Sequence, residues 1–143
     1  LEIIHHPGAA AIVAVDDAGR VALVRQYRHA AGGWILELPA GKLDAGEPPL
    51  ACAARELREE TGLVADDLHE LGWIFTTPGF TDEKIFLFLA RRLHQGDADL
   101  QHDEVLTVEH VPFADALAMI HRGEIRDAKS IAGLFLASRE LVR

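Results

Sequence analysis

Apolar and polar residues alternate in short blocks along this chain. Brief runs rich in Val, Ile and Leu predict β-strands at residues 10–15, 21–24, 34–38, 71–75, 85–89 and 105–111. The first two runs flank an Asp/Gly turn at residues 16–19, so they are predicted to form a β-hairpin. Glycine, proline or small polar residues fill the segments that predict loops, at residues 30–33, 40–47 and 76–82.

Three longer segments predict helices. In residues 48–61 two prolines suit a first turn, and the following Gly62 suits a left-handed cap. The apolar positions of this helix that recur at helical spacing, and are expected to pack on a sheet, are Leu50, Ala53, Ala54 and Leu57. A second helix should follow Pro112, and a third, capped by Asp127, should run to Leu141. Helices mixed with strands in this order predict an α/β fold with helices on the faces of a mixed sheet.

Composition narrows the class of protein. At 143 residues the chain fits a single domain covering residues 1–143. Its 49% hydrophobic and 26% charged residues are typical of a soluble globular protein. The formal net charge of −9 argues against a nucleic-acid or membrane-surface partner, which would need surplus Lys and Arg, and it fits a protein that binds divalent cations.

Cysteine content and apolar runs bear on the compartment. With Cys52 as its one cysteine, the chain has no internal disulfide and no thiolate zinc site. We find no apolar run long enough to cross a bilayer and no signal segment, so a cytoplasmic location is expected. Because the chain begins with Leu1 rather than Met, part of the native N-terminal region is expected to be missing.

Three carboxylates carry the candidate chemistry. Glu56, Glu59 and Glu60 lie three and four residues apart on the first predicted helix, so their side chains share one side of it. Such like charges destabilise a bare helix, and hard carboxylate ligands suit Mg²⁺, with Mn²⁺ as a substitute. Taken alone, the charged run 55–60 fits better with an ordinary solvated helix face. Whether these carboxylates form a metal site therefore depends on the residues around the run.

The surrounding residues match a long motif. The segment GKLDAGEPPLACAARELREETGL, residues 41–63, resembles the Nudix box at each of its fixed positions, which here are Gly41, Glu47, Arg55, Glu56, Leu57, Glu59, Glu60, Gly62 and Leu63. The resemblance implies a Nudix-type α/β/α sandwich with a mixed sheet, in which the box forms a loop–helix–loop catalytic motif. It also implies a metal site held by the side chains of Glu56 and Glu60, assisted by Glu59, and by the backbone carbonyl of Ala40.

The resemblance leaves some roles open. It makes Arg55 and Glu47 positioners of the carboxylate cluster, although an ordinary pair between Arg55 and Glu59 on the helix surface is an equal alternative. For water activation, or for holding a further metal ion, the family resemblance indicates Glu104, in the acidic stretch 96–104. His102 and Asp103 could substitute for it, and a solvated acidic loop is the alternative.

Outside the box the chain resembles the ADP-ribose pyrophosphatase branch in residues 24–41, 77–83 and 123–130. Pro78, 15 residues beyond the box, is the feature that marks this branch. The substrate-binding residues that the resemblance implies are Arg28, Glu37, Lys42, Pro78, Gly79 and Glu83. Arg28 could instead be a surface charge, Glu83 a loop carboxylate, and Gly79 a requirement of the turn. Phe80 and Trp34 could stack on a base or fill the core, and the core is favoured for Trp34.

The predicted activity is Mg²⁺-dependent hydrolysis of a nucleoside diphosphate sugar, with ADP-ribose cleaved to AMP and ribose 5-phosphate. Hydrolysis of GDP-mannose or another nucleotide sugar is an alternative. A non-catalytic nucleotide-sugar binding module is a second, which the complete set of Glu56, Glu59 and Glu60 argues against. The resemblance also implies a homodimer.

Overall fold

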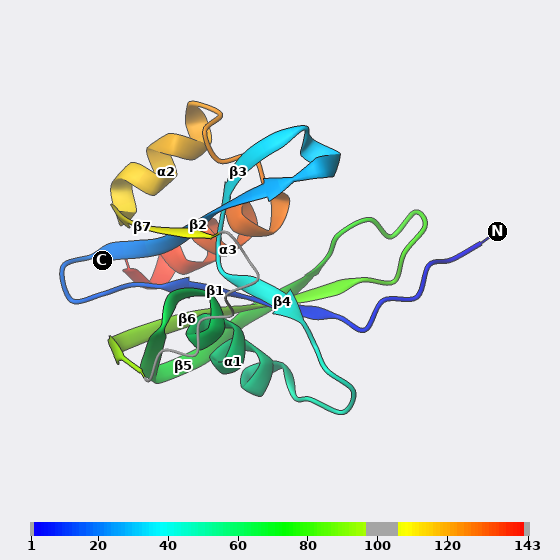
Figure 1. Ribbon diagram of the computed structural model, residues 1–143, viewed down its shortest axis with the longest axis horizontal. Coiled ribbons are helices and arrows are strands. Elements are labelled where there is room, and N and C mark those ends of the chain that lie inside the picture. The colour runs from blue at the N-terminus through cyan, green and yellow to red at the C-terminus, as the bar shows by residue number, and fades with distance from the viewer. Residues whose placement is uncertain (1, 97–105, 142–143) are drawn as a thin grey trace.

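The computed structural model describes residues 2–96 and 106–141, and these residues form two β-sheets and three α-helices (Figure 1). The strands are β1 (Ala9–Ala14), β2 (Arg20–Arg28), β3 (Gly33–Glu37), β4 (Ala40–Lys42), β5 (Leu63–Phe75), β6 (Lys84–Gln95) and β7 (Thr107–Pro112). The helices are α1 (Pro49–Thr61), α2 (Phe113–His121), α3 (Ala128–Leu141) and the short 3₁₀ helix η1 (His29–Ala31). No helix within the described ranges is long and apolar enough to cross a bilayer.

The larger sheet is mixed and lies between helices. Its strand order is β4-β1-β6-β5, with β1 parallel to β6 and the other pairs antiparallel. Because side chains alternate along a strand, β1 is buried on both faces: Ile12 packs in the cluster of α1, and Val13 packs in the cluster that contains Leu134 of α3. The predicted α/β/α sandwich with a mixed sheet is thereby confirmed.

The predicted hairpin between the first two strands is wrong. A tight turn at residues 16–19 joins them, but the pairing that follows is one isolated bridge between Val15 and Val21. Beyond it β1 pairs with β4 and β6, whereas β2 joins β3 and β7 in a second, antiparallel sheet. The residues of the turn correctly indicated a turn. The pairing of β1, however, is determined by contacts with strands distant in sequence, and a local pattern carries no information about those contacts.

Helix α1 has the expected ends and an unexpected buried face. Pro49 is its first residue, and Gly62 caps it with φ of 76°, a left-handed conformation that glycine adopts without strain. Ala53 and Leu57 are buried as predicted, but Leu50 is 50% exposed and Ala54 is exposed too. The buried face is rotated toward Glu60, which is only 8% exposed, so the metal-ligand candidates lie at the edge of the packed surface.

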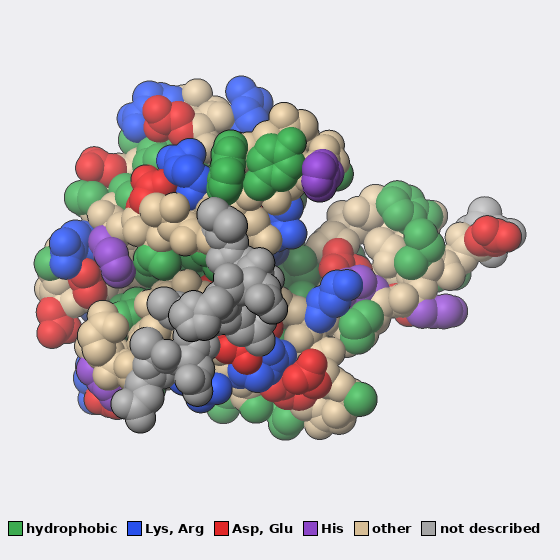
Figure 2. All heavy atoms as spheres, viewed as in Figure 1, with side chains coloured by type: hydrophobic (Ala, Val, Ile, Leu, Met, Phe, Trp, Pro, Cys, Tyr) green, Lys and Arg blue, Asp and Glu red, His purple; other side chains and the backbone are tan. Residues whose placement is uncertain are grey.

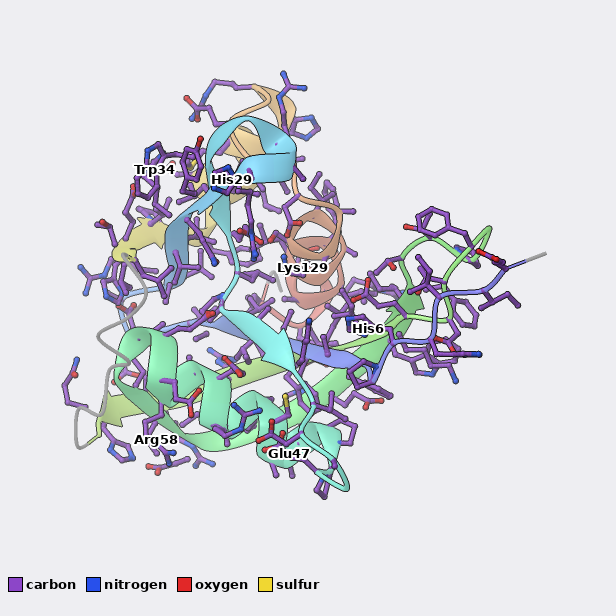
Figure 3. The ribbon with its side chains drawn as sticks, turned by 45° about the vertical axis from the view of Figure 1, so that its right-hand side comes forward. His6, His29, Trp34, Glu47, Arg58 and Lys129 are labelled. Atoms are coloured by element: carbon purple, nitrogen blue, oxygen red, sulfur yellow. The ribbon has the colours of Figure 1, made fainter. Side chains whose placement is uncertain are left out.

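Two other expectations need correction. The predicted loop 40–47 begins with β4, a three-residue strand that pairs with β1. Trp34 is 52% exposed rather than in the core. It lies on the part of the β2–β3 hairpin that carries η1, and its ring packs edge-on against Tyr27 with centroids 5.6 Å apart (Figure 3).

Candidate active site

A cavity of about 650 Å³ is lined by strands of both sheets, by α1 and by the first residues of α3. Its polar lining comes from segments distant in sequence, namely His6, Gln26, Arg28, Lys42, Asp44, Arg55, Glu56, Glu60, Thr76, Glu83, Asp127 and Lys129. Acidic and basic side chains therefore face one space, which suits a ligand that brings both a cation and phosphate groups.

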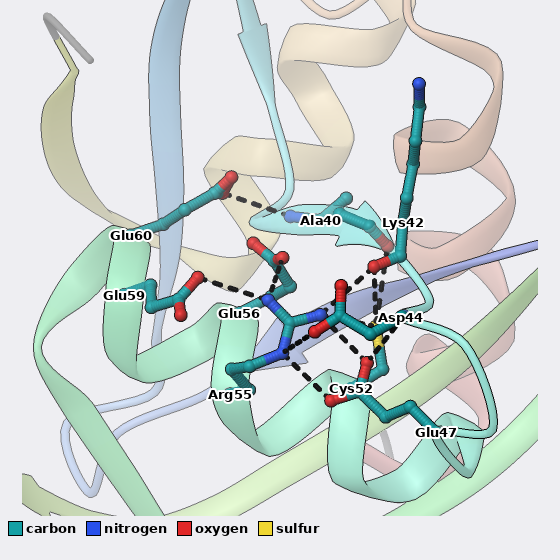
Figure 4. Close-up of polar contacts among 10 residues, drawn as sticks. Ala40, Lys42, Asp44, Glu47, Cys52, Arg55, Glu56, Glu59 and Glu60 are labelled. Carbon is teal, nitrogen blue, oxygen red and sulfur yellow. Dashed lines mark hydrogen bonds and ion pairs between the residues drawn. The ribbon is translucent and has the colours of Figure 1, made fainter. Parts of the chain in front are cut away.

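Arg55 organises the acidic side of the cavity (Figure 4). Its Nε and Nη2 donate to the two carboxylate oxygens of Glu47 at 2.9 and 2.8 Å. Its Nη1 donates to Glu56 at 2.7 Å and to Glu59 at 3.2 Å, and Nη2 also reaches the carbonyl of Lys42. One guanidinium thus fixes three carboxylates of the box. The two alternatives predicted for Arg55, a helix-surface pair with Glu59 and contacts that position the carboxylates, are therefore both present.

The pairing of Arg55 with Glu47 shifts the titration of both groups. The hydrogen bond from Arg55 holds the pKa of Glu47 at about 2. The same hydrogen bond raises the pKa of Arg55 above its usual value. Behind them, burial raises the pKa of the Cys52 thiol to about 12, so this cysteine is a protonated packing residue and not a nucleophile.

The carboxylates of Glu60 and Glu56 both lie against the β4 backbone. The amide of Ala40 donates to Glu60 at 3.1 Å. Glu56 lies so close to Gly41 that a Cβ built there would be 2.1 Å from the Glu56 carboxyl carbon. Only glycine at position 41 leaves room for this carboxylate next to the strand.

On the opposite wall of the cavity, two cationic side chains bind one buried carboxylate. The Glu37 carboxylate, 2% exposed, accepts hydrogen bonds from Arg28 at 2.9 and 3.1 Å and from Lys129. The hydrogen bond with Glu37 raises the pKa of Arg28. Lys129 also donates to Asp127 at 2.9 Å, and Asp127 caps α3 through the backbone N–H of Ser130. Arg28 and Lys129 line the cavity, and their hydrogen bonds to Glu37 and Asp127 fix where these two cationic groups lie.

The donor set of the acidic side fits a hard divalent cation. The candidate ligands are carboxylate and carbonyl oxygens, which Mg²⁺-type ions prefer. Within residues 2–96 and 106–141, no three acidic or histidine side chains already converge on one point. The Arg55 guanidinium lies between Glu56 and Glu59, where it balances their charge, and Glu60 turns to the Ala40 amide.

The structure places some of the predicted site residues at the cavity and others away from it. Those that line the cavity are Arg28, Ala40, Lys42, Arg55, Glu56, Glu60 and Glu83. Four others do not line it: Glu59 reaches Arg55, Glu37 lies behind the two cations, and Pro78 and Gly79 belong to the turn at residues 77–80. Glu104 and its alternatives His102 and Asp103 lie outside the described residues.

Sequence reasoning gave no site role to several side chains of the cavity wall, among them Lys129, His6 and Thr76. Lys129 lies in a segment that carries part of the resemblance, but no role was assigned to it. His6 and Thr76 contact Glu83, at 3.0 and 2.7 Å. The position of His6 near the N-terminus carries no local signal, because its partner Glu83 lies more than half the chain away.

Comparison with known proteins decides the family. Residues 5–134 match the model of the NUDIX domain. The chain belongs to the NUDIX family. The resemblance predicted from the box is thereby confirmed, and the Nudix match extends far beyond the box itself.

Two curated relatives of this Nudix chain are similar over most of its length. An ADP-ribose pyrophosphatase of Mycobacterium tuberculosis is 47% identical over 93% of the chain, and one of Bacillus subtilis is 43% identical over 90%. The chain spans 66% and 71% of these relatives' own lengths, about two thirds. A solved structure, described as the crystal structure of an ADP compounds hydrolase, matches with a TM-score of 0.85 and 27% identity, covering 94% of this chain and 72% of the other.

The low pKa of Glu47 predicts how this Nudix chain responds to acid. With the pKa lowered from 4.5 to about 2, the ion pair with Arg55 stabilises the fold fully above pH 4.5 and less as the pH falls toward 2. We expect the difference in free energy of unfolding between wild type and Glu47→Gln, measured by urea denaturation without added metal, to shrink across this range. A difference that grows on acidification would contradict this account.

Proposed function

We propose that this chain is a pyrophosphohydrolase that cleaves a nucleoside diphosphate linked to a sugar. The proposed substrate is ADP-ribose, and the products are AMP and ribose 5-phosphate. The observation that carries the proposal is the pairing of opposite charges across one cavity, with Glu56 and Glu60 facing Arg28 and Lys129. The printed names of the relatives support the same reaction.

In the proposed reaction a water oxygen bonds to one phosphorus, and the bond from that phosphorus to the bridging oxygen breaks. The bridging oxygen leaves with the other phosphate. Glu56, Glu59, Glu60 and the Ala40 carbonyl would hold the cation. A bound divalent ion, which we propose to be Mg²⁺, neutralises phosphate charge and lowers the pKa of water.

The chain's own residues then orient the diphosphate. The guanidinium of Arg28 can fork onto two phosphate oxygens, and Glu37 fixes its plane through the paired hydrogen bonds. Lys129 adds a point charge beside it. Arg55 keeps the ligand carboxylates on one side of α1. We propose Glu104 as the base that accepts the proton of the attacking water, a role that comes from the family resemblance.

The family resemblance also supports two finer proposals. One is a homodimer, and the other is a cytoplasmic location. Both proposals concern the whole protein. This chain spans about two thirds of the length of the two curated relatives.

The preference for a bridged diphosphate can be measured directly. We expect kcat/KM for ADP-ribose to exceed that for 8-oxo-dGTP by more than about tenfold, a transition-state difference of ~1.4 kcal/mol. The reason is that the Pro78 segment and Arg28 resemble those of the family branch that acts on a diphosphate bridging two sugars. Product chromatography should give AMP and ribose 5-phosphate with Mg²⁺ present and nothing when the ion is chelated.

Two outcomes would change the assignment. Equal or better hydrolysis of the triphosphate would move the chain to another substrate class, and a higher kcat/KM for GDP-mannose would select the other nucleotide sugar. If no compound of the panel is cleaved although it binds, the chain acts as a binding module.

A further inference from the structure

The N-terminal segment is tied to the loop that carries Glu83. The backbone of Ile4 makes two hydrogen bonds with that loop. Its N–H donates to the Phe80 carbonyl at 2.7 Å, and its carbonyl accepts from the Asp82 N–H at 3.2 Å. The His6 amide donates to the Asp82 carboxylate at 2.8 Å. These two segments project together from one side of the molecule (Figure 1, Figure 2), and the contacts place the His6 side chain at the cavity (Figure 3).

Hydrogen bonds define the tautomer of His6. The backbone N–H of Gly8 donates to His6 Nδ1 at 3.0 Å, so Nδ1 is the acceptor nitrogen and carries no hydrogen. The hydrogen of the neutral ring is therefore on Nε2, which lies 3.0 Å from Glu83 Oε2. Gly8 reaches this position with φ of 95°, a conformation that side-chain-bearing residues rarely adopt.

The Glu83 carboxylate is held from both sides and still faces the cavity. Its Oε1 accepts from the hydroxyl of Thr76 at 2.7 Å, and its Oε2 lies 3.0 Å from His6 Nε2. A carboxylate has about four acceptor positions, so about two remain. The side chains of His6 and Glu83 are 20% and 24% exposed, which leaves those positions accessible to a ligand in the cavity.

Sheet geometry places Glu83 at a distance from the proposed metal site. Lys42 of β4 and Ile85 of β6 are both register partners of Ala9 in β1. They are two strand spacings apart, roughly 10 Å, and Glu83 lies two residues before Ile85. A group bound to Glu83 would thus lie beyond the phosphates, on the side away from the box.

We propose that His6 is a positioning residue that fixes Glu83 as the acceptor for neighbouring hydroxyl groups of the terminal sugar. The Thr76 hydroxyl takes an acceptor position on one oxygen, and His6 Nε2 lies against the other, so the remaining positions face a pair of adjacent hydroxyls. This inference rests on the proposed function. It adds a residue that determines specificity for the sugar and that does not touch the reacting phosphorus.

Two variants separate the two contacts of the His6 ring. In His6→Gln the side-chain amide N–H lies where Nε2 was, so the contact with Glu83 survives. In His6→Asn the side-chain oxygen lies where Nδ1 was, so the bond from Gly8 survives and the contact with Glu83 is lost. Loss of a polar contact with a charged group should raise KM for ADP-ribose by about tenfold or more in His6→Asn, with a smaller change in kcat. His6→Gln should retain most of the wild-type KM.

The comparison substrate is the methyl ester of ADP, which has the diphosphate and no terminal sugar. Its KM should be the same in His6→Asn and wild type, and His5→Asn, next to His6 but directed to Asp82, is the matched control variant. An equal rise of KM for both substrates would mean that His6 merely ties the N-terminal segment to the fold, and it would overturn the inference, as would a wild-type KM in His6→Asn. If His6→Asn melts below the assay temperature, Thr76→Val tests the other donor with the same two substrates. Failure of the wild type to cleave either substrate would overturn the proposed function itself.

Discussion

Glu56→Gln and Glu60→Gln should each lower kcat by about 10²–10³, the usual loss when one preorganised electrostatic contact is removed. Glutamine keeps the length and shape of glutamate but removes the charge that a metal ligand supplies. In Glu60→Gln the side-chain oxygen can still accept from the Ala40 amide, which the native carboxylate does at 3.1 Å, so the fold should survive. Steady-state kinetics on ADP-ribose at saturating Mg²⁺, with melting temperatures of each variant, would measure both effects.

A matched surface substitution serves as the control. Glu70→Gln on β5 makes the same chemical change at an exposed position outside the cavity, and its kcat should equal that of wild type. Near-normal turnover of both box variants at saturating metal would rule out the proposed metal site. A loss in Glu70→Gln as large as in the box variants would point to a general effect of charge.

Gly41→Ala should lower turnover by about 10²-fold, although it adds only a methyl group. The new Cβ would lie 2.1 to 2.5 Å from the carboxyl atoms of Glu56, so that carboxylate must move. The atoms in the way form the far end of a flexible side chain, so the fold can accommodate the methyl group with a change in stability of about 1 kcal/mol or less. A misplacement of about 1 Å in a catalytic group is enough for a loss of this size.

Gly33→Ala is the control for this experiment. A Cβ added at position 33 would meet no atom within 4 Å, and the residue does not have a positive φ, so alanine should be tolerated with full activity. A fully active Gly41→Ala would show that Glu56 does not need its place beside the β4 backbone. A large fall in melting temperature would show that the methyl group acts on the fold rather than on the site.

The sequence predicted features whose signals are local. The ends of α1 followed from Pro49 and Gly62, whose backbone preferences act within one turn of helix. The exposure of Leu50 was not predictable in the same way, because helical spacing is compatible with more than one buried face. The choice between them was made by contacts with β1, β2 and β6.

In the candidate site, too, the contacts between residues close in sequence were predictable and those between distant residues were not. The carboxylates of the box and Arg55 lie within one short segment, and their proximity followed from helical spacing. The attachment of Lys129 to Glu37 and of His6 to Glu83 depends on residues 92 and 77 positions apart. No spacing rule covers such pairs. Even where a residue was singled out, as with Glu37, the sequence did not reveal that two cations enclose its carboxylate.

The wide separation of these contacts has a consequence for the order in which the molecule assembles. Arg55 reaches Glu47, Glu56 and Glu59 across at most eight residues, so little loop-closure entropy opposes the acidic half of the cavity. The cationic half needs α3 to dock, because Lys129 meets Glu37 and Ser130 meets the Leu38 amide only across 92 residues. Such distant contacts form slowly. We therefore expect a chain emerging from the ribosome to form the proposed metal-ligand face first, and to complete the proposed phosphate-binding wall only when α3 docks.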